Sequence, residues 1–374
     1  MMRAPQLLLL LAFLCLTSSV AVADDSLDVD KTIAKIKLLG GEVTRDDTLP
    51  GRPVIGIDFQ GSKRVSDGFL HLLRDFTSLK SLSLGDTQIS DVGLTKLRHL
   101  KHLTSLDLYH TQVTDVGLKE LVELTNLTSL CLWDTKITDA GVKELNGLKG
   151  LTELNLSSTK ITDDCLQEIN QHAQLTKLNL SGMPLRKMGV GLKELHGLKN
   201  LKTLSFVGSR IGNDGLKVLG QHENLTTLLL SGTFITDEGV KELKELKNLT
   251  TLDLGATHLT GIGLKELSKL TNLTTLDVSR SKITDVGMKE LAELKSLTNL
   301  DLSDTKITDA GLTEISELKH LTILRLRSTL ITDDGLKALR KQKDLTYLDL
   351  AGTNTTDAGM KELKESLPNL VIGQ

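Results

Sequence analysis

Leucine residues recur in one fixed arrangement along almost the whole chain. The segment Leu103-Thr-Ser-Leu106-Asp-Leu108 is followed 24 residues later by Leu127-Thr-Ser-Leu130-Cys-Leu132. The step is 24 residues except near the first copy, at the Leu175 copy (two extra residues) and before a partial copy at Leu370 (one extra). The thirteen copies begin at Val54, Leu79, Leu103, Leu127, Leu151, Leu175, Leu201, Leu225, Leu249, Leu273, Leu297, Leu321 and Leu345.

Each copy contains two hydrophobic periods, which predict one strand and one helix. The L-x-x-L-x-L part ends in alternation with a period of two, which is typical of a short strand with one buried face. The following G-L-K-E-L-x-x-L part places leucines three apart, as at Leu118 and Leu121, and predicts a helix whose apolar stripe faces the same core. Thr114-Asp115 has the composition of a helix cap, and Gly117 permits a close approach to the next coil.

One copy cannot bury its own leucines, but stacked copies can. We therefore expect an α/β solenoid of about thirteen coils, with a parallel sheet on the concave face and helices on the convex face. The predicted division is a signal peptide at 1–23, an N-terminal cap at 24–53, the solenoid at 54–366 and a C-terminal cap at 367–374. The N-terminal cap is expected to contain a helix over Leu27 to Leu39.

The first residues have the features of an export signal. Arg3 precedes the apolar run 7–16, and Ala21-Val22-Ala23 forms an A-x-A cleavage site. The run is too short to anchor the chain across a bilayer. We therefore expect a secreted, periplasmic or cell-surface protein without a transmembrane segment.

The repeats resemble those of the leucine-rich-repeat family. The resemblance rests on the L-x-x-L-x-L segments and on the T-x-I-T-D-x-G-L run, as at 111–118, 135–142 and 305–312, and it covers about 320 residues. Thr stands where many family members have Asn or Cys. The 24-residue form is similar to the cysteine-containing-type repeats of F-box substrate receptors and to repeat proteins secreted by some bacteria. The resemblance implies a horseshoe-shaped leucine-rich-repeat solenoid that binds other molecules.

Composition narrows the function further. Aromatic residues make up 2% of the chain, so the core must be aliphatic, and the formal net charge of -3 gives no reason to expect nucleic-acid binding. The sequence has no H-E-x-x-H, G-x-S-x-G or Walker A motif. We expect no enzymatic activity, no cofactor and no metal.

Three recurring polar features have structural interpretations. An Asp recurs before the predicted helices and, although a line of carboxylates can hold calcium, we interpret it as a helix cap. Histidines near the helix ends are predicted to be exposed, and a recurring Lys-Glu pair predicts a convex surface whose charges offset one another. The Asp residues are 91, 115, 139, 163, 237, 285, 309, 333 and 357, and the histidines are His99, His102, His172, His196, His222 and His320. The lysines of the pairs are Lys119, Lys143, Lys193, Lys241, Lys265, Lys289 and Lys361.

The concave face is where specificity is expected, because the side chains between the strand leucines point out of the sheet. Most copies carry small polar residues there, whereas two consecutive copies carry Tyr109 and Trp133 at one equivalent position. Large aromatic side chains beside polar groups are typical of binding hot spots. The alternative is that Trp133 folds back over the turn as packing. The candidate ligand-binding residues are Asp107, Tyr109, His110, Cys131, Trp133 and Asp134.

A second candidate patch is basic and consists of Arg280, Arg325 and Arg327. It has two interpretations. The arginines either receive an acidic partner or pair with Asp301 and Asp304 of the same face.

The sequence therefore predicts an exported, monomeric, non-catalytic scaffold that recognises a protein or peptide. One alternative is an F-box-like adaptor of a ubiquitin ligase, which the signal peptide and the short region before Val54 argue against. Another is a glycan or cell-wall binder, in which Tyr109 and Trp133 stack on sugars.

Overall fold

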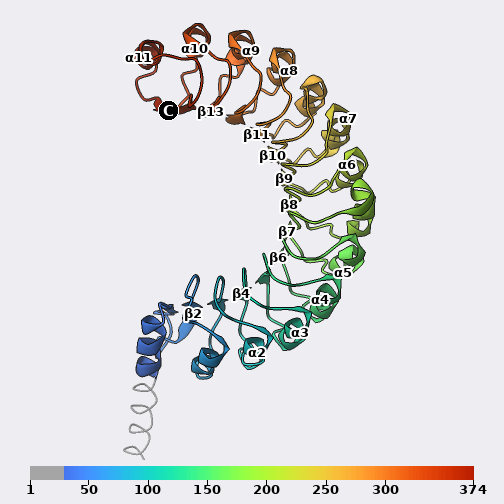
Figure 1. Ribbon diagram of the computed structural model, residues 1–374, viewed down its shortest axis with the longest axis vertical. Helices are drawn as coiled ribbons and strands as arrows, with labels where there is room; N and C mark the ends of the chain where they lie inside the picture. The colour runs from blue at the N-terminus through green and yellow to red at the C-terminus, as the bar shows by residue number, and fades with distance from the viewer. Residues whose placement is uncertain (1–28) are drawn as a thin grey trace, which may run out of the picture.

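The computed structural model describes residues 29–374, which form an open horseshoe (Figure 1). The strands line the inner side of the arc and the helices line its outer side. The predicted signal peptide, residues 1–23, lies outside the described residues. Among the residues that are described, no helix is both long and apolar enough to span a lipid bilayer.

The inner side is one sheet of 15 strands that follow one another in chain order. Residues 24 apart pair across neighbouring strands, as Leu106 does with Leu130, whereas at the Leu175 copy Leu178 pairs with Leu204. At the C-terminal end Leu348 pairs with Ile372. The strand pairing thus keeps the 24-residue step, although Leu370, which is buried like Leu345, lies 25 residues after it.

All strand pairs are parallel except the antiparallel pair β1–β2. The strands are β1 (Glu42–Arg45), β2 (Val54–Asp58), β3 (Ser81–Ser83), β4 (Ser105–Asp107), β5 (Ser129–Cys131), β6 (Glu153–Asn155), β7 (Lys177–Asn179), β8 (Thr203–Ser205), β9 (Thr227–Leu229), β10 (Thr251–Asp253), β11 (Thr275–Asp277), β12 (Asn299–Asp301), β13 (Ile323–Arg325), β14 (Tyr347–Asp349) and β15 (Val371–Gly373).

The outer side consists of short α-helices and 3-10 helices. Helices need about 10 Å of lateral space and paired strands need about 4.8 Å, so stacking the two sets bends the sheet toward its strand side. The α-helices are α2 (Asp91–Leu94), α3 (Asp115–Leu118), α4 (Asp139–Glu144), α5 (Leu166–Ile169), α6 (Asn213–Leu219), α7 (Asp237–Val240), α8 (Asp285–Leu291), α9 (Asp309–Glu314), α10 (Asp333–Leu339) and α11 (Asp357–Ser366). The 3-10 helices are η1 (Asp67–Leu73), η2 (Lys119–Glu123), η3 (Leu145–Gly147), η4 (Asp163–Cys165), η5 (Arg186–Leu195), η6 (Lys241–Glu245), η7 (Ile262–Lys269) and η8 (Ile315–Glu317).

One continuous leucine core lies between the two sides, as the repeat pattern predicted. Leucines of the strand part, such as Leu106 and Leu130, and of the helical part, such as Leu118 and Leu121, are all buried. The chain also forms a hydrogen-bond ladder beside the strands, in which the Thr152 hydroxyl donates to a carbonyl of the preceding coil at 3.0 Å. Each coil is thus fixed to the next by apolar burial and by polar contacts.

The N-terminal end of the core is covered by a helix over residues 29–38 and by β1. Ile33 and Ile36 of this helix are buried, whereas Leu38 is exposed. Strand β1 was not predicted from the sequence. Its antiparallel pairing with β2 protects the backbone edge that a parallel sheet would otherwise leave open.

The prediction that the recurring Asp caps its own helix is wrong. The cap is the preceding Thr, whose hydroxyl in Thr114 accepts from the Val116 N–H at 3.3 Å. The Asp115 carboxylate instead accepts from the N–H and the hydroxyl of Thr138 in the next coil, at 2.8 and 2.6 Å. Asp91, Asp139, Asp285, Asp309 and Asp333 make the same pair of contacts. The Asp column therefore joins neighbouring coils.

The glycine of the repeat belongs to the same contact. A Cβ on Gly141 would overlap the Asp115 carboxylate, so a side chain at this position requires a local shift of the helix start or of the carboxylate. Copies that depart from the pattern adapt locally. Cys165 replaces this Gly and its helix begins as 3-10, and Asn213 replaces the Asp while still accepting from the Thr236 N–H at 3.1 Å.

Two of the six histidines predicted to be exposed are buried. His99, His102, His196 and His320 are exposed, but His172 and His222 lie in the core. They occupy the position that Leu148 and Leu246 hold in other coils. Burial lowers the pKa of both rings, because the charged form loses water. The prediction failed because polarity was weighed without the repeat position.

The buried His172 should make the fold sensitive to acid. Its pKa is lower in the folded chain than in the unfolded chain, so below about pH 6.5 the unfolded state binds the proton first. Stability is therefore expected to fall as the pH drops from 7.5 to 5.5. Chemical denaturation at both pH values should show a smaller loss for His172→Leu than for the parent. The exposed control His196→Leu should behave like the parent, and an equal loss in all three proteins would contradict this assignment.

Candidate functional site

Tyr109 and Trp133 lie on the concave side, each two residues beyond the end of a strand, β4 and β5. Their rings are stacked, with centroids 5.2 Å apart and planes inclined by 18°. Aromatic pairs of this geometry add about 0.5–1.5 kcal/mol beyond their area burial. The register of the sheet therefore brings the two residues together.

Three coils hold this aromatic stack in place. Gln60 donates from its amide to the Tyr109 hydroxyl at 3.2 Å. The Tyr109 ring lies over Gly85, where a Cβ would overlap it. Trp133 packs on Tyr109 and still exposes 44% of its surface. The stack is thus both packed and accessible, so a partner could contact Trp133 with little side-chain ordering.

Asp107 and Cys131 pair with one another in strands β4 and β5, each two residues before its aromatic residue. Asp107 accepts from the Tyr109 N–H at 3.0 Å and so fixes the turn that presents Tyr109. Burial raises the pKa of the Cys131 thiol to about 12. The thiol therefore stays protonated at neutral pH and is not a nucleophile.

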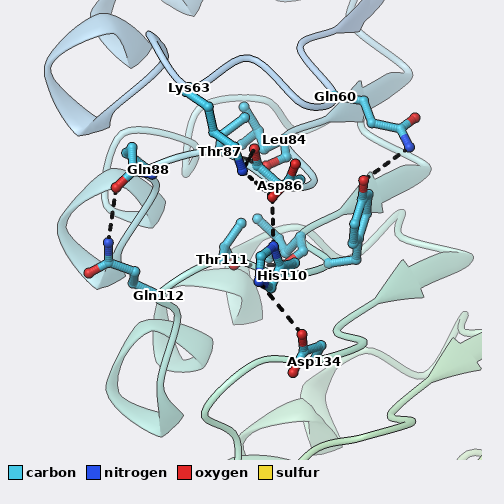
Figure 2. Close-up of polar contacts among 12 residues, drawn as sticks. Gln60, Lys63, Leu84, Asp86, Thr87, Gln88, His110, Thr111, Gln112 and Asp134 are labelled. Atoms are coloured by element: carbon cyan, nitrogen blue, oxygen red, sulfur yellow. Dashed lines mark hydrogen bonds and ion pairs between the residues drawn. The ribbon is translucent and has the colours of Figure 1, made fainter.

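His110 and Asp134 stand next to the stack, at the rim of the horseshoe. Both have a left-handed backbone, with φ of 50° and 53°, because the chain turns there after each strand. Figure 2 shows contacts running from Lys63 through Asp86 and His110 to Asp134. The His110 ring lies between two carboxylates, with Nδ1 2.6 Å from Asp86 and Nε2 3.7 Å from Asp134.

This rim network is charged and open to solvent. Hydrogen bonds from Lys63 and His110 hold the pKa of the Asp86 carboxyl below its usual value. A hollow of about 510 Å³ lies against it and is also lined by Gln112 and Lys160. His110 and Asp134 therefore offer polar contacts to a ligand that reaches over the rim from the aromatic stack.

A hollow of about 350 Å³ lies on the concave face on the other side of Cys131 and extends across β5 to β9. The side-chain Oδ1 atoms of Asn155 and Asn179 accept from the backbone N–H groups of Ser157 and Ser181, at 3.1 and 3.0 Å. These contacts orient both side-chain amides. Their NH₂ groups are left to donate elsewhere, although that of Asn155 reaches the Cys131 sulfur at 3.7 Å. Sequence reasoning missed this hollow, whose signal was two consecutive copies with Asn at one position.

The structure does not bring the three predicted arginines into one cluster. Arg280 lies two coils before Arg325 and forms an ion pair with Asp304 at 3.3 Å. Arg325 lies over the Tyr347 ring at 6.0 Å from its centroid and pairs in register with Asp301. Arg280 thus pairs with an aspartate although its side chain remains 73% exposed, whereas Arg327 is exposed and forms no ion pair within residues 29–374.

Acidic side chains also line the concave face near these arginines. Asp253, Asp277 and Asp301 follow one another in register on β10, β11 and β12. Burial and the neighbouring Asp277 raise the pKa of Asp253 and Asp301. Within residues 29–374, no three His, Cys, Asp or Glu side chains are arranged to hold a metal ion.

Comparisons with known proteins agree with this architecture. A family model described as "Leucine rich repeat" matches residues 247–307, one described as "Leucine Rich repeats (2 copies)" matches 77–120, and a third, "Leucine Rich repeat", matches 151–169, 221–244 and 317–339. No curated protein sequence matches the chain.

Two bacterial structures show the same fold. An internalin from Listeria monocytogenes superimposes with a TM-score of 0.65 at 22% identity, over 86% of this chain and 90% of that protein. A leucine-rich-repeat protein from Leptospira interrogans superimposes with a TM-score of 0.55 at 23% identity, over 83% and 88% of the two chains. At these identities the likeness concerns the fold alone.

Proposed function

This chain is a leucine-rich-repeat protein, and we propose that it is an exported, non-catalytic scaffold that binds a protein or peptide partner on its concave face. The observation that carries the proposal is the exposed stack of Tyr109 and Trp133 beside a polar hollow. A leucine-rich-repeat fold of this kind is typically a binding scaffold. The candidate site residues are Asp107, Tyr109, His110, Cys131, Trp133 and Asp134.

Each part of the candidate site has a role in this proposal. Trp133 is the side chain that anchors the partner, the Tyr109 ring stacks on it, and Asp107 positions Tyr109. His110 and Asp134 contact the partner at the rim, while the Asn155 amide can donate to a backbone carbonyl of a peptide. Because the sheet and the Gln60 contact already hold these groups, binding costs little ordering entropy.

A peptide fits this site better than a small molecule. The two hollows and the stack between them span several coils, and the hollows are open rather than enclosed. Hydrogen-bond donors spaced along a sheet, next to an exposed aromatic side chain, match the alternating carbonyls and side chains of an extended segment. A monomeric scaffold suffices for this mode of binding.

Replacing both aromatic residues should abolish capture of the partner. Tyr109→Ala/Trp133→Ala removes the anchor and its support, and we expect affinity to fall by at least about tenfold, as hot-spot truncations do. The measurement is a pull-down from envelope and medium fractions of the source organism, followed by titration of the captured partner. Circular dichroism establishes that the variant is folded.

The matched control is Phe234→Ala, which truncates an exposed aromatic residue on another part of the rim. It should capture the partner as well as the parent does. Equal recovery by all three proteins would contradict the aromatic site and leave Arg280, Arg325 and Arg327 as the better candidates. Loss of capture after enzymatic removal of glycans from the fractions would instead favour a glycan ligand.

A further inference from the structure

The convex surface of the first two coils lacks a Lys-Glu pair that most coils carry. Most coils carry a Lys-Glu pair at the same place on their helix, as Lys143 and Glu144 do in α4. The first coil has His71-Leu72 there and the second has Thr95-Lys96. The glutamate that would offset neighbouring cations is therefore missing twice in succession.

Where these glutamates are missing, the convex surface carries a basic pocket. It is formed by His71, Arg74, Lys96, Arg98 and His99. These residues surround a hollow of about 530 Å³ between η1 and the segment that follows α2. Leu70, Thr77 and Thr95 complete its lining, so no carboxylate lines it. The hollow thus concentrates positive charge in a chain whose formal net charge is -3.

The cations of the basic pocket differ in how they are paired. Arg98 forms an ion pair with Glu120 of the next coil. Arg74 and Lys96, in contrast, form no ion pair with any residue of the 29–374 portion. Elsewhere on the convex side Lys101 reaches Glu123 at 2.8 Å and Arg340 contacts Glu362. Unpaired cations around a hollow are available to a ligand.

We propose that the basic pocket binds a phosphate group. An arginine guanidinium offers a planar set of N–H donors that suits phosphate oxygens, and a lysine adds a compact charge. The imidazoles of His71 and His99 line the same hollow, and each donates one ring N–H to a carbonyl, that of Gly68 or Leu73. The other ring nitrogen of each can donate to phosphate when the ring is protonated. The aliphatic stems of Arg74 and Lys96, with Leu70, leave room for an apolar part of the ligand beside the phosphate.

The binding test uses inorganic phosphate as the probe and the full chain in low-salt buffer. Titration should show saturable binding by calorimetry and shifts of the His71 and His99 ring signals in NMR spectra. Arg74→Gln/Lys96→Gln should weaken binding by roughly tenfold. The matched control Lys143→Gln/Lys265→Gln removes the same charge from two ordinary coils, and its affinity should stay within about twofold of the parent.

Two results would overturn the proposal. Equal weakening in both double variants would show an effect of net charge alone, and titration without shifts of His71 and His99 would place phosphate elsewhere. A further variant, Lys96→Glu, restores the residue type of the ordinary coils and should lose binding as the first double variant does. Because Lys96 is exposed, this change leaves the core intact.

A second experiment identifies the source of the phosphate. Vesicles of phosphatidylcholine containing phosphatidic acid are sedimented with the parent and with Lys96→Glu. Cosedimentation of the parent alone supports a lipid headgroup as the ligand. Binding of inorganic phosphate without cosedimentation supports a soluble phosphate ester.

Discussion

Replacing Leu252 by alanine is expected to lower the free energy of unfolding by about 2–5 kcal/mol. Leu252 lies in β10 and is completely buried in the leucine core. It pairs in register with Leu228 of β9 and Leu276 of β11. Because stability in a repeat protein is a sum over coils and the interfaces between them, a cavity at this position weakens one coil and both of its interfaces.

The measurement is chemical denaturation followed by circular dichroism, since a long repeat array need not melt in one step. The control is Val286→Ala, which also shortens a branched apolar side chain to a methyl group. Val286 is 69% exposed, so this change leaves no buried cavity. It should change the free energy of unfolding by no more than about 0.5 kcal/mol. A Leu252→Ala protein as stable as this control would mean that the core is assigned wrongly.

The repeat pattern predicted the fold well because one spacing serves two purposes. The leucines of L-x-x-L-x-L must be buried, and the same 24-residue step sets which residues pair in the sheet, as in Leu130 and Leu154. The pattern could not predict β1, since the four residues Glu42–Arg45 do not belong to a repeat. Their pairing depends on the exposed edge of β2, which exists only once the solenoid has formed.

The candidate site was predicted to a smaller extent. Equivalent repeat positions placed Tyr109 and Trp133 side by side, but the sequence does not state that Gly85 leaves space for the Tyr109 ring. It also does not show that His110 lies between Asp86 and Asp134, because those contacts depend on a turn with a left-handed backbone. Contacts between coils are about 24 residues apart, and a reading of local signals such as helix caps overlooks them.

The recurring Asp shows the difference between a local helix cap and a contact between coils. Its replacement is the second change for which we expect a large loss of stability. Asp115→Ala removes two hydrogen bonds from a carboxylate to Thr138 and should cost about 2–3 kcal/mol. Gly141→Ala should cost about 1–3 kcal/mol, because the new Cβ and the Asp115 carboxylate would occupy the same space. Both values come from chemical denaturation of the single variants.

The double variant Asp115→Ala/Gly141→Ala separates a contact between coils from a cap within one helix. With the carboxylate gone the Cβ fits, and alanine is favoured over glycine in a helix by about 1 kcal/mol. The second change should therefore be neutral or stabilising in the Asp115→Ala background, which gives a coupling energy of at least about 1 kcal/mol. Asp115→Ala combined with Gly311→Ala, a glycine that faces Asp285 instead, should be additive within about 0.5 kcal/mol. Additivity in both pairs would mean that Asp115 acts only on its own helix, whereas coupling confined to the first pair would establish that the recurring Asp and Gly act together to join successive coils.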